Sequence, residues 1–378
     1  MDNSLKIMLF PALLSATSSS LASVSVYKGT NENLNLGLGL RVEIVNQKDS
    51  SEKALNNSFQ SNYEARFYMN GQILEGVDAT FNLVSFEGNM KLLDAIVQFS
   101  FAEAFKVWVG HMPPPASRFN LSGPFYQNAW VFPSLVVRYP SQLAGRDNGL
   151  TIWGELGGGL LKYQIGAFEG LGRSPVINAM GSFDAPNKEE NPLLTTRFTF
   201  NFLERMPGYY NRGTSYGSKH ILTLGLVYQN QASAVGTGAS ISPAGSPAKK
   251  GDYTAFNIDL LYERPLAQSS VLTIESAYFN YDSEHLDAFR QGTGSLILIS
   301  YLLPQESEGK GRLQPALRYQ SYKDEISDQT LTRIDAQLSY IMKGHDARVS
   351  LVWARQEYLL GLKKENIKSI LFGTQLQI

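Results

Sequence analysis

Apolar and polar residues alternate with a period of two along nearly the whole chain. The segment 332–354 shows this most clearly, with two alternating runs around a Lys-Gly-His turn. The apolar row of this segment is Ile334, Ala336, Leu338, Tyr340, Ala347, Val349, Leu351 and Trp353. A period of two places successive side chains on opposite faces of a β-strand, so this segment predicts a hairpin. Its apolar row must face either a protein core or lipid.

The same pattern predicts about 16 strands, the even number typical of bacterial porins. The strands are expected near residues 34–44, 63–70, 77–83, 91–100, 104–111, 147–156, 159–169, 193–203, 220–230, 252–263, 270–281, 294–303, 311–322, 330–342, 344–355 and 365–378. If both chain ends lie on one side, the connections alternate between short turns and long loops, as in outer-membrane barrels. The segment 204–219 is the exception, because it is long but falls among the short turns. Either the strand count is off there or this turn is elaborated.

The N-terminus has the pattern of a secretory leader. Lys6 precedes the apolar run 7–14, and Ser20-Leu21-Ala22 fits the small-x-small cleavage rule. We therefore expect a signal peptide at 1–22 and a mature domain at 23–378. No later segment approaches the roughly 18 apolar residues of a membrane helix. An exported chain without such helices can span a membrane only as a closed barrel, which satisfies every backbone polar group.

The exported leader and the sustained number of strands favour lipid over a protein core as the neighbour of the apolar rows. A soluble sandwich would show the same alternation in any one hairpin. Here the polar rows carry many full charges, as the water-filled lumen of a porin would require. The basic members expected to line this lumen are Arg41, Arg66, Lys106, Lys162, Arg197, Arg318, Arg333 and Arg348. We predict an all-β, transmembrane, antiparallel barrel with Leu38, Phe81, Leu338 and Leu351 facing outer-membrane lipids.

Charge and cysteine content exclude several other classes. The chain has 33 basic and 34 acidic residues, which gives no sign of a nucleic-acid partner. It has no cysteine, so thiolate metal sites are not available, and the four histidines lack metal-ligand spacing. Its glycine-rich stretches are not followed by a helical pattern, which argues against nucleotide binding. We expect neither a metal nor a cofactor.

The last strand runs to the final residue. The segment "SILFGTQLQI" alternates and ends on Ile378. An apolar terminal strand resembles the signal by which barrels are handed to the barrel-assembly machinery, although those strands usually end in Phe.

Three motifs resemble the phosphate-selective porin O and P family. They are a Gly-x-x-x-Pro step at Gly110–Pro114, a Gly-Arg-Asp-x-Gly segment at Gly145–Gly149 and a Gly-His-x-Ala-Arg hairpin at Gly344–Arg348. The resemblance spans most of the mature chain. It implies a 16-stranded channel in the outer membrane of a Gram-negative bacterium, commonly a homotrimer, with anion preference in the founding members.

The long loop 112–146 carries charge of one sign only. It contains Arg118, Arg138 and Arg146 but no Asp, Glu or Lys, and it is rich in proline and aromatic residues. A loop this long and apolar is expected to fold into the barrel and narrow it. Its arginines would then form a constriction that favours small anionic solutes such as phosphate, other oxyanions or carboxylates. For each arginine, an ion pair with an acid of the barrel wall such as Asp147 or Glu155 remains an equal alternative.

The sequence therefore predicts a passive channel rather than an enzyme. The alternative is a barrel that acts as an outer-membrane enzyme, or as a receptor or adhesin without an open pore. The one Gly-x-Ser-x-Gly match, Gly213–Gly217, lies in the connection 204–219 and is followed by a predicted strand rather than a helix, so it is not a nucleophile elbow. A catalytic Ser-His pair on the outer wall, however, would leave no pattern in the sequence.

Overall fold

The computed structural model describes residues 23–50, 57–86, 88–139, 145–170, 176–177, 183–184, 191–236, 250–284, 291–304, 311–360 and 363–378. Its strands are β1 (Val24–Lys28), β2 (Asn33–Asp49), β3 (Asn57–Leu74), β4 (Val77–Phe86), β5 (Asn89–Ala102), β6 (Phe105–Met112), β7 (Asp147–Leu156), β8 (Leu161–Phe168), β9 (Val176–Ile177), β10 (Phe183–Asp184), β11 (Leu193–Asn201), β12 (Ile221–Gly236), β13 (Lys250–Pro265), β14 (Val271–Asp282), β15 (Gly292–Leu302), β16 (Arg312–Asp324), β17 (Gln329–Lys343), β18 (Ala347–Leu360) and β19 (Lys363–Gln377). Its helices are α1 (Arg118–Ser122), η1 (Gly157–Gly159) and η2 (Ala267–Ser269).

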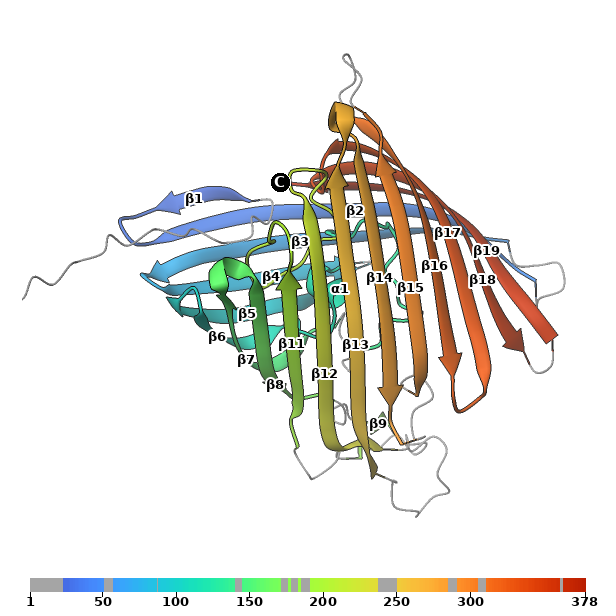
Figure 1. Cartoon of the computed structure of the whole chain (residues 1–378), viewed down its shortest axis with the longest axis horizontal. Helices are drawn as coiled ribbons and strands as arrows, with labels where there is room; N and C mark the ends of the chain where they lie inside the picture. Colours follow the sequence, from blue (N-terminus) through green and yellow to red (C-terminus); the bar gives the residue numbers. More distant parts are fainter. Residues whose placement is uncertain are drawn as a thin grey trace, which may run out of the picture.

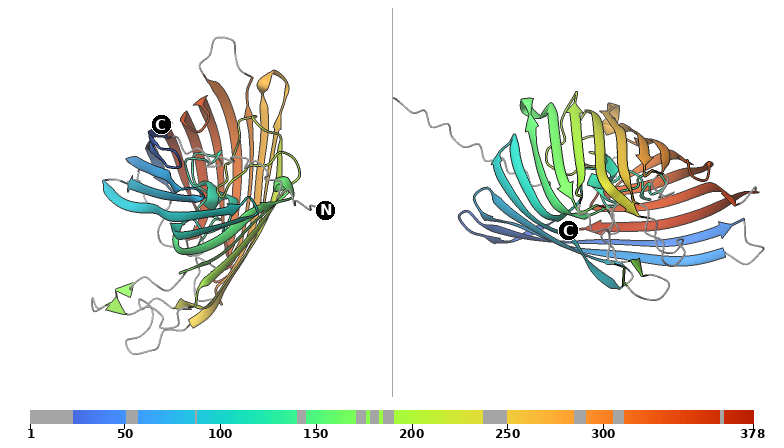
Figure 2. Two further views of the ribbon diagram at one scale, coloured as in Figure 1. Left: turned by 90° about the vertical axis from the view of Figure 1, so that its left-hand side faces the viewer. Right: turned by 90° about the horizontal axis from the view of Figure 1, so that it is seen from below.

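Sixteen of these strands, β2–β8 and β11–β19, form one closed antiparallel barrel (Figures 1 and 2). The ring closes where β19 pairs with β2, as at Leu371 and Val45. Beyond the last residue of β19, the short strand β1 continues on the same edge of β2, with Val24 opposite Leu36. The predicted barrel is thus confirmed, and β1 is an additional strand outside the ring.

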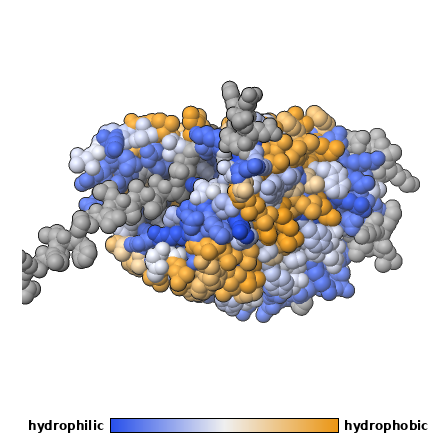
Figure 3. All heavy atoms as spheres, turned by 45° about the horizontal axis from the view of Figure 1, so that its top comes forward, coloured by the Kyte–Doolittle hydropathy of each residue, from blue (hydrophilic) through white to orange (hydrophobic). Residues whose placement is uncertain are grey.

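The barrel is polar inside and apolar outside. In the β17–β18 hairpin, Leu338 and Leu351 are 45% and 49% exposed, whereas Ser339 and Arg348 are fully buried. Leu38 and Phe81 are also exposed on the outer face. Broad apolar patches lie on the outside of the molecule (Figure 3). Because a soluble protein buries its apolar rows, this inverted arrangement matches a barrel wall that faces lipid.

The strands extend beyond the predicted segments at several ends. The segment predicted at 34–44 is part of β2, which continues through Val45 and the polar residues 46–49, and the segment predicted at 63–70 lies within the longer β3. The ladder needs only backbone groups, so pairing continues where the apolar alternation stops. All predicted strands are present in order.

The connections fall on two rims of the barrel. The short-turn rim carries the connections 75–76, 103–104, 157–160, 266–270 and 344–346, whereas the β6–β7 and β8–β11 connections, among others, start and end at the opposite, long-loop rim. The segment 202–220 connects β11 to β12 on the short-turn rim, so the strand count is right and this turn is elaborated. We call 202–220 the folded turn, and the described residues between β6 and β7, 113–139 and 145–146, the inward loop.

The inward loop enters the barrel, as predicted. Its short helix α1 lies inside the ring of strands (Figures 1 and 2). Ser117 caps this helix by accepting a hydrogen bond from the Asn120 backbone amide. No described helix has the length and apolar character needed to cross a membrane.

Candidate functional site in the barrel lumen

Basic side chains of the wall hold the tip of the inward loop by its backbone. Arg348 donates to the carbonyl oxygen of Gln127 at 2.8 Å, and Arg41 donates to that of Trp130 at 2.8 Å. Arg318 donates to the Val131 carbonyl at 2.6 Å. These hydrogen bonds satisfy loop carbonyls that have no strand partner, and a charged donor makes them stronger than neutral ones.

Trp130 fixes the position of the loop tip against the wall. Its indole nitrogen donates to Glu43 at 2.9 Å, and its backbone amide donates to Gln337 at 2.7 Å. Its ring lies directly over Gly373, where an added Cβ would come within 2.2 Å of the indole. Only glycine therefore allows the ring to pack this closely on β19.

Wall acids hold the beginning of the loop. Arg118 forms an ion pair with Glu275 at 2.5 Å and donates to the Arg212 carbonyl at 2.9 Å. The backbone amide of Arg118 donates to Asp259, which also forms two hydrogen bonds with Arg197, at 2.6 and 2.7 Å. Only 4% of Arg118 is exposed. The charge of Arg118 is therefore largely compensated by the wall.

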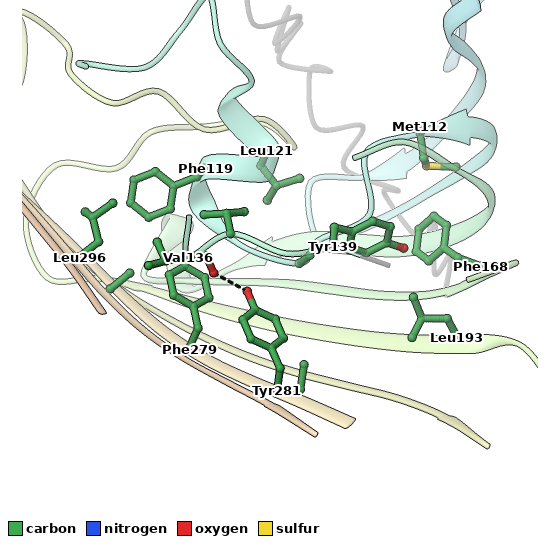
Figure 4. Close-up of a cluster of buried hydrophobic side chains, with 14 of the residues drawn as sticks. Met112, Phe119, Leu121, Val136, Tyr139, Phe168, Leu193, Phe279, Tyr281 and Leu296 are labelled. Atoms are coloured by element: carbon green, nitrogen blue, oxygen red, sulfur yellow. Dashed lines mark hydrogen bonds between the residues drawn. The ribbon is translucent and has the colours of Figure 1, made fainter. Parts of the chain in front are cut away.

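The later part of the loop packs on β14 and β15 through apolar contacts (Figure 4). The Tyr281 hydroxyl donates to the Val136 carbonyl at 2.9 Å and accepts from the Arg138 amide at 3.0 Å. The Arg138 guanidinium lies 3.6 Å from the centre of the Tyr322 ring, a cation–π contact. Arg138 thus joins the loop to the wall and is buried there.

The folded turn also enters the barrel and meets the inward loop. Tyr209 stacks on Trp108 with ring centroids 4.2 Å apart, and Lys162 donates to the Gly208 carbonyl at 2.8 Å. The Gly213 amide donates to the Tyr126 carbonyl at 2.7 Å, which joins the two segments.

A buried carboxylate anchors the end of the folded turn. Glu263 on β13 accepts hydrogen bonds from the hydroxyl of Thr214, from the amide and hydroxyl of Ser215, and from the Gly217 amide. These donors take the place of a cation, since no ion pair to Glu263 is present among the described residues.

A cavity of about 1100 Å³, including space open to solvent, lies between the wall, the inward loop and the folded turn. We call it the lumen cavity. Four cationic side chains and one carboxylate line it: Arg66 from β3, Arg146 from the inward loop, Arg212 and Lys219 from the folded turn, and Asp94 from β5. The lumen cavity is therefore basic, although the chain as a whole is nearly neutral.

The four cations of the lumen cavity are compensated to different degrees. Arg66 pairs with Glu64 at 2.6 Å, and Arg146 pairs with Asp94 at 3.2 Å. Lys219 donates to the Arg205 carbonyl at 2.5 Å. Arg212 is half-buried over the Tyr126 ring at 5.8 Å, and no described carboxylate lies within ion-pair distance of it. Arg212 is thus the cation most available to a solute.

The predicted site residues fall into three groups. Arg66 and Arg146 line the lumen cavity. Arg41, Lys162, Arg318 and Arg348 hold loop or turn carbonyls, as described above. The remaining residues contact wall or loop groups: Arg118, Arg138, Arg197, Lys106 over the Trp153 ring at 4.4 Å, and Arg333 beside Asp335 at 2.8 Å.

Sequence reasoning missed Arg212 and Lys219. The signal was present in the unusual length of the 204–219 connection on the short-turn rim. A turn that long, with basic and tyrosine residues, has enough chain to enter the barrel, but its direction depends on tertiary contacts.

Solved bacterial outer-membrane proteins share this fold at low sequence identity. The anion-selective porin of Comamonas acidovorans aligns over 92% of this chain and 100% of its own, with a TM-score of 0.54 and 12% identity. Pseudomonas putida OprB aligns over 91% of this chain and 94% of its own, with a TM-score of 0.58 and 11% identity. The channel DcaP of Acinetobacter baumannii aligns over 94% of this chain and 100% of its own, with a TM-score of 0.55 and 9% identity. No family model and no curated protein sequence matches the chain.

Proposed function

We propose that the chain is an outer-membrane porin, a water-filled channel for passive diffusion of small solutes, and not an enzyme. The observation that carries this proposal is the inverted barrel. Its charged rows lie inside a closed ring around a solvent-open cavity, and its apolar rows lie outside. This arrangement suits a path for polar solutes through lipid.

The channel favours anions, among them oxyanions and carboxylates. Its selectivity resides in Arg66, Arg146, Arg212 and Lys219, which outnumber Asp94 where the lumen is narrowed by the inward loop and the folded turn. Charge of one sign in a confined space raises the local concentration of the opposite ion. Arg118 and Arg138 contribute mainly by holding the inward loop, because Glu275 and Tyr322 contact their guanidinium groups.

The cellular setting follows from the same proposal. The signal peptide at 1–22 directs export, the barrel-assembly machinery inserts the chain into the outer membrane, and three copies form a homotrimer. A solved protein with this fold, OmpT of Vibrio cholerae, is described in a trimer form, with a TM-score of 0.51 and 13% identity. Chemical crosslinking of the purified protein in detergent tests the trimer.

Conductance across planar lipid bilayers tests the channel directly. Purified protein added to one chamber should give stepwise, long-lived current increases in KCl. Heat-denatured protein from the same preparation is the control for contaminating pores. A folded barrel that inserts without current steps would favour a receptor, an adhesin or an enzyme of the outer wall instead.

A further inference from the structure

The lumen cavity combines basic and apolar side chains. Besides its charged residues, it is lined by seven apolar or aromatic residues: Tyr68, Leu93, Leu121, Tyr126, Met206, Pro207 and Tyr210. They come from the wall, the inward loop and the folded turn, so the apolar lining is not confined to one element. A path for small inorganic ions alone gains nothing from such a lining, whereas small-molecule sites are mostly apolar with a few placed polar groups.

The folded turn presents an unused donor at this lining. Asn211 lies between Tyr210 and Arg212, and only 9% of it is exposed. Its Nδ2 is buried and has no hydrogen-bond partner among the described residues, and Asn211 is one of the residues that line the lumen cavity. A buried donor without a partner is costly, and an acceptor oxygen of a solute would satisfy it. The neighbouring Arg212 supplies a positive charge for the same oxygen.

The β4–β5 wall of the lumen cavity presents acceptors instead of donors. Asn82 donates through Nδ2 to Asp94 at 2.8 Å, which leaves its Oδ1 without a partner in the part of the chain that the structure describes. Asp94 adds a carboxylate. The cations of the lumen cavity would attract a compact, multiply charged oxyanion, but these acceptors and the apolar rings would oppose the loss of its hydration shell there.

We infer that the lumen cavity is a binding site for an organic carboxylate whose charge is carried on an apolar, ring-sized body. The carboxylate accepts from Asn211 and Arg212. The body packs against Tyr210, Tyr68 and Leu93. This inference rests on the proposed channel function and specifies its solute class.

Solute block of single-channel conductance tests the inference. Benzoate, acetate, inorganic phosphate and uncharged benzamide would each be added to the KCl bath of an inserted channel. Benzoate should reduce the current at a concentration about fivefold or more below that needed for acetate, since only benzoate has a ring to pack. Benzamide and phosphate should both block more weakly than benzoate. Benzamide has the ring but no negative charge, and phosphate has negative charge but no ring.

Two variants test separately the contacts of the solute's carboxylate and those of its apolar body. Arg212→Gln should raise the half-blocking concentration of benzoate by about tenfold, as expected for a lost charged hydrogen bond. Tyr210→Ser should raise that concentration by about fivefold and leave acetate unchanged. Lys343→Gln is the matched control, because Lys343 lies on the same rim, is 78% exposed, pairs with Asp346 and is not among the residues that line the lumen cavity.

The outcomes separate this inference from the channel proposal. If acetate, phosphate and benzoate block at equal concentrations, and Tyr210→Ser leaves these concentrations unchanged, the carboxylate site is refuted. The proposed channel function is not affected by that result. If no current steps are seen with any solute, the channel proposal itself fails.

Discussion

Arg348 on β18 donates a hydrogen bond of 2.8 Å to the backbone carbonyl of Gln127, 221 residues earlier in the chain. Its second terminal nitrogen donates to Gln375 on β19 at 3.1 Å. The guanidinium thus fastens the tip of the inward loop to the wall. Arg41 and Arg318 likewise donate hydrogen bonds to carbonyl oxygens of the loop tip. A cation of the wall can therefore narrow the lumen by positioning a loop.

Replacing Arg348 should loosen the inward loop. Arg348→Met keeps much of the side-chain volume but leaves the Gln127 carbonyl without its charged donor, at a cost of roughly 1–3 kcal/mol. We expect the barrel to assemble and the open-channel current to become noisier and larger. Single-channel recording in KCl measures both quantities.

Arg355→Met is the matched control for Arg348→Met. Arg355 lies on the same strand but is 42% exposed and pairs with Glu357. The Arg355→Met variant should show the same current noise as the original chain. Equal noise in the two variants would mean that Arg348 does not hold the loop.

The outward orientation of Leu338 gives a second prediction. Leu338→Arg places a charge on the apolar outer face, which costs roughly 2–4 kcal/mol near the middle of the bilayer. We expect a reduced yield of folded, membrane-inserted protein. Leu338→Phe, which keeps the position apolar, should insert like the original chain. Normal insertion of the Arg variant would place this face away from lipid.

His345 makes the folding stability of the barrel depend on pH. It lies in the turn between β17 and β18, with Nε2 3.1 Å from the Thr214 carbonyl, to which it donates. Burial, together with the positive charge of Arg348, lowers the pKa of His345 from 6.5 to about 3. The folded state therefore holds the neutral form, while the unfolded chain takes up a proton below pH 6.5.

The stability that neutral His345 contributes is complete above pH 6.5 and is lost as the pH falls towards 3. Each pH unit in this window costs up to about 1.4 kcal/mol. His345→Gln removes the pH-dependent stability that comes from protonation of His345. Between pH 6.5 and 4, the unfolding temperature of this variant in detergent should therefore fall less than that of the original chain. Parallel curves for the two proteins would contradict the assignment.

The architecture could be predicted because alternation is a local property of the sequence. The rows around Leu338 and Leu351 identify two strands and their outward face without knowledge of any partner. The ends of the strands could not be predicted in the same way, because polar residues such as those at 46–49 continue the ladder through backbone groups alone.

The partners of the lumen residues could not be predicted from the sequence. Arg118 was expected to face the solute, with Asp147 or Glu155 as alternative partners, but Glu275 lies 157 residues away and contacts it only in the folded barrel. The direction of the folded turn likewise depends on contacts with Glu263 on β13 and Trp108 on β6, which are far from it in sequence.

Reversal potential across a KCl gradient tests the central claim most directly, that the cations of the lumen cavity make the channel favour anions. At low salt, where screening extends over about 30 Å at 0.01 M, the original chain should show a reversal potential of the anion-selective sign. Arg212→Gln combined with Lys219→Gln should shift it towards zero, and Arg118→Met, whose charge is paired with Glu275, should shift it less. A reversal potential of zero or of cation-selective sign in the original chain, or no shift in the double variant, would contradict the account.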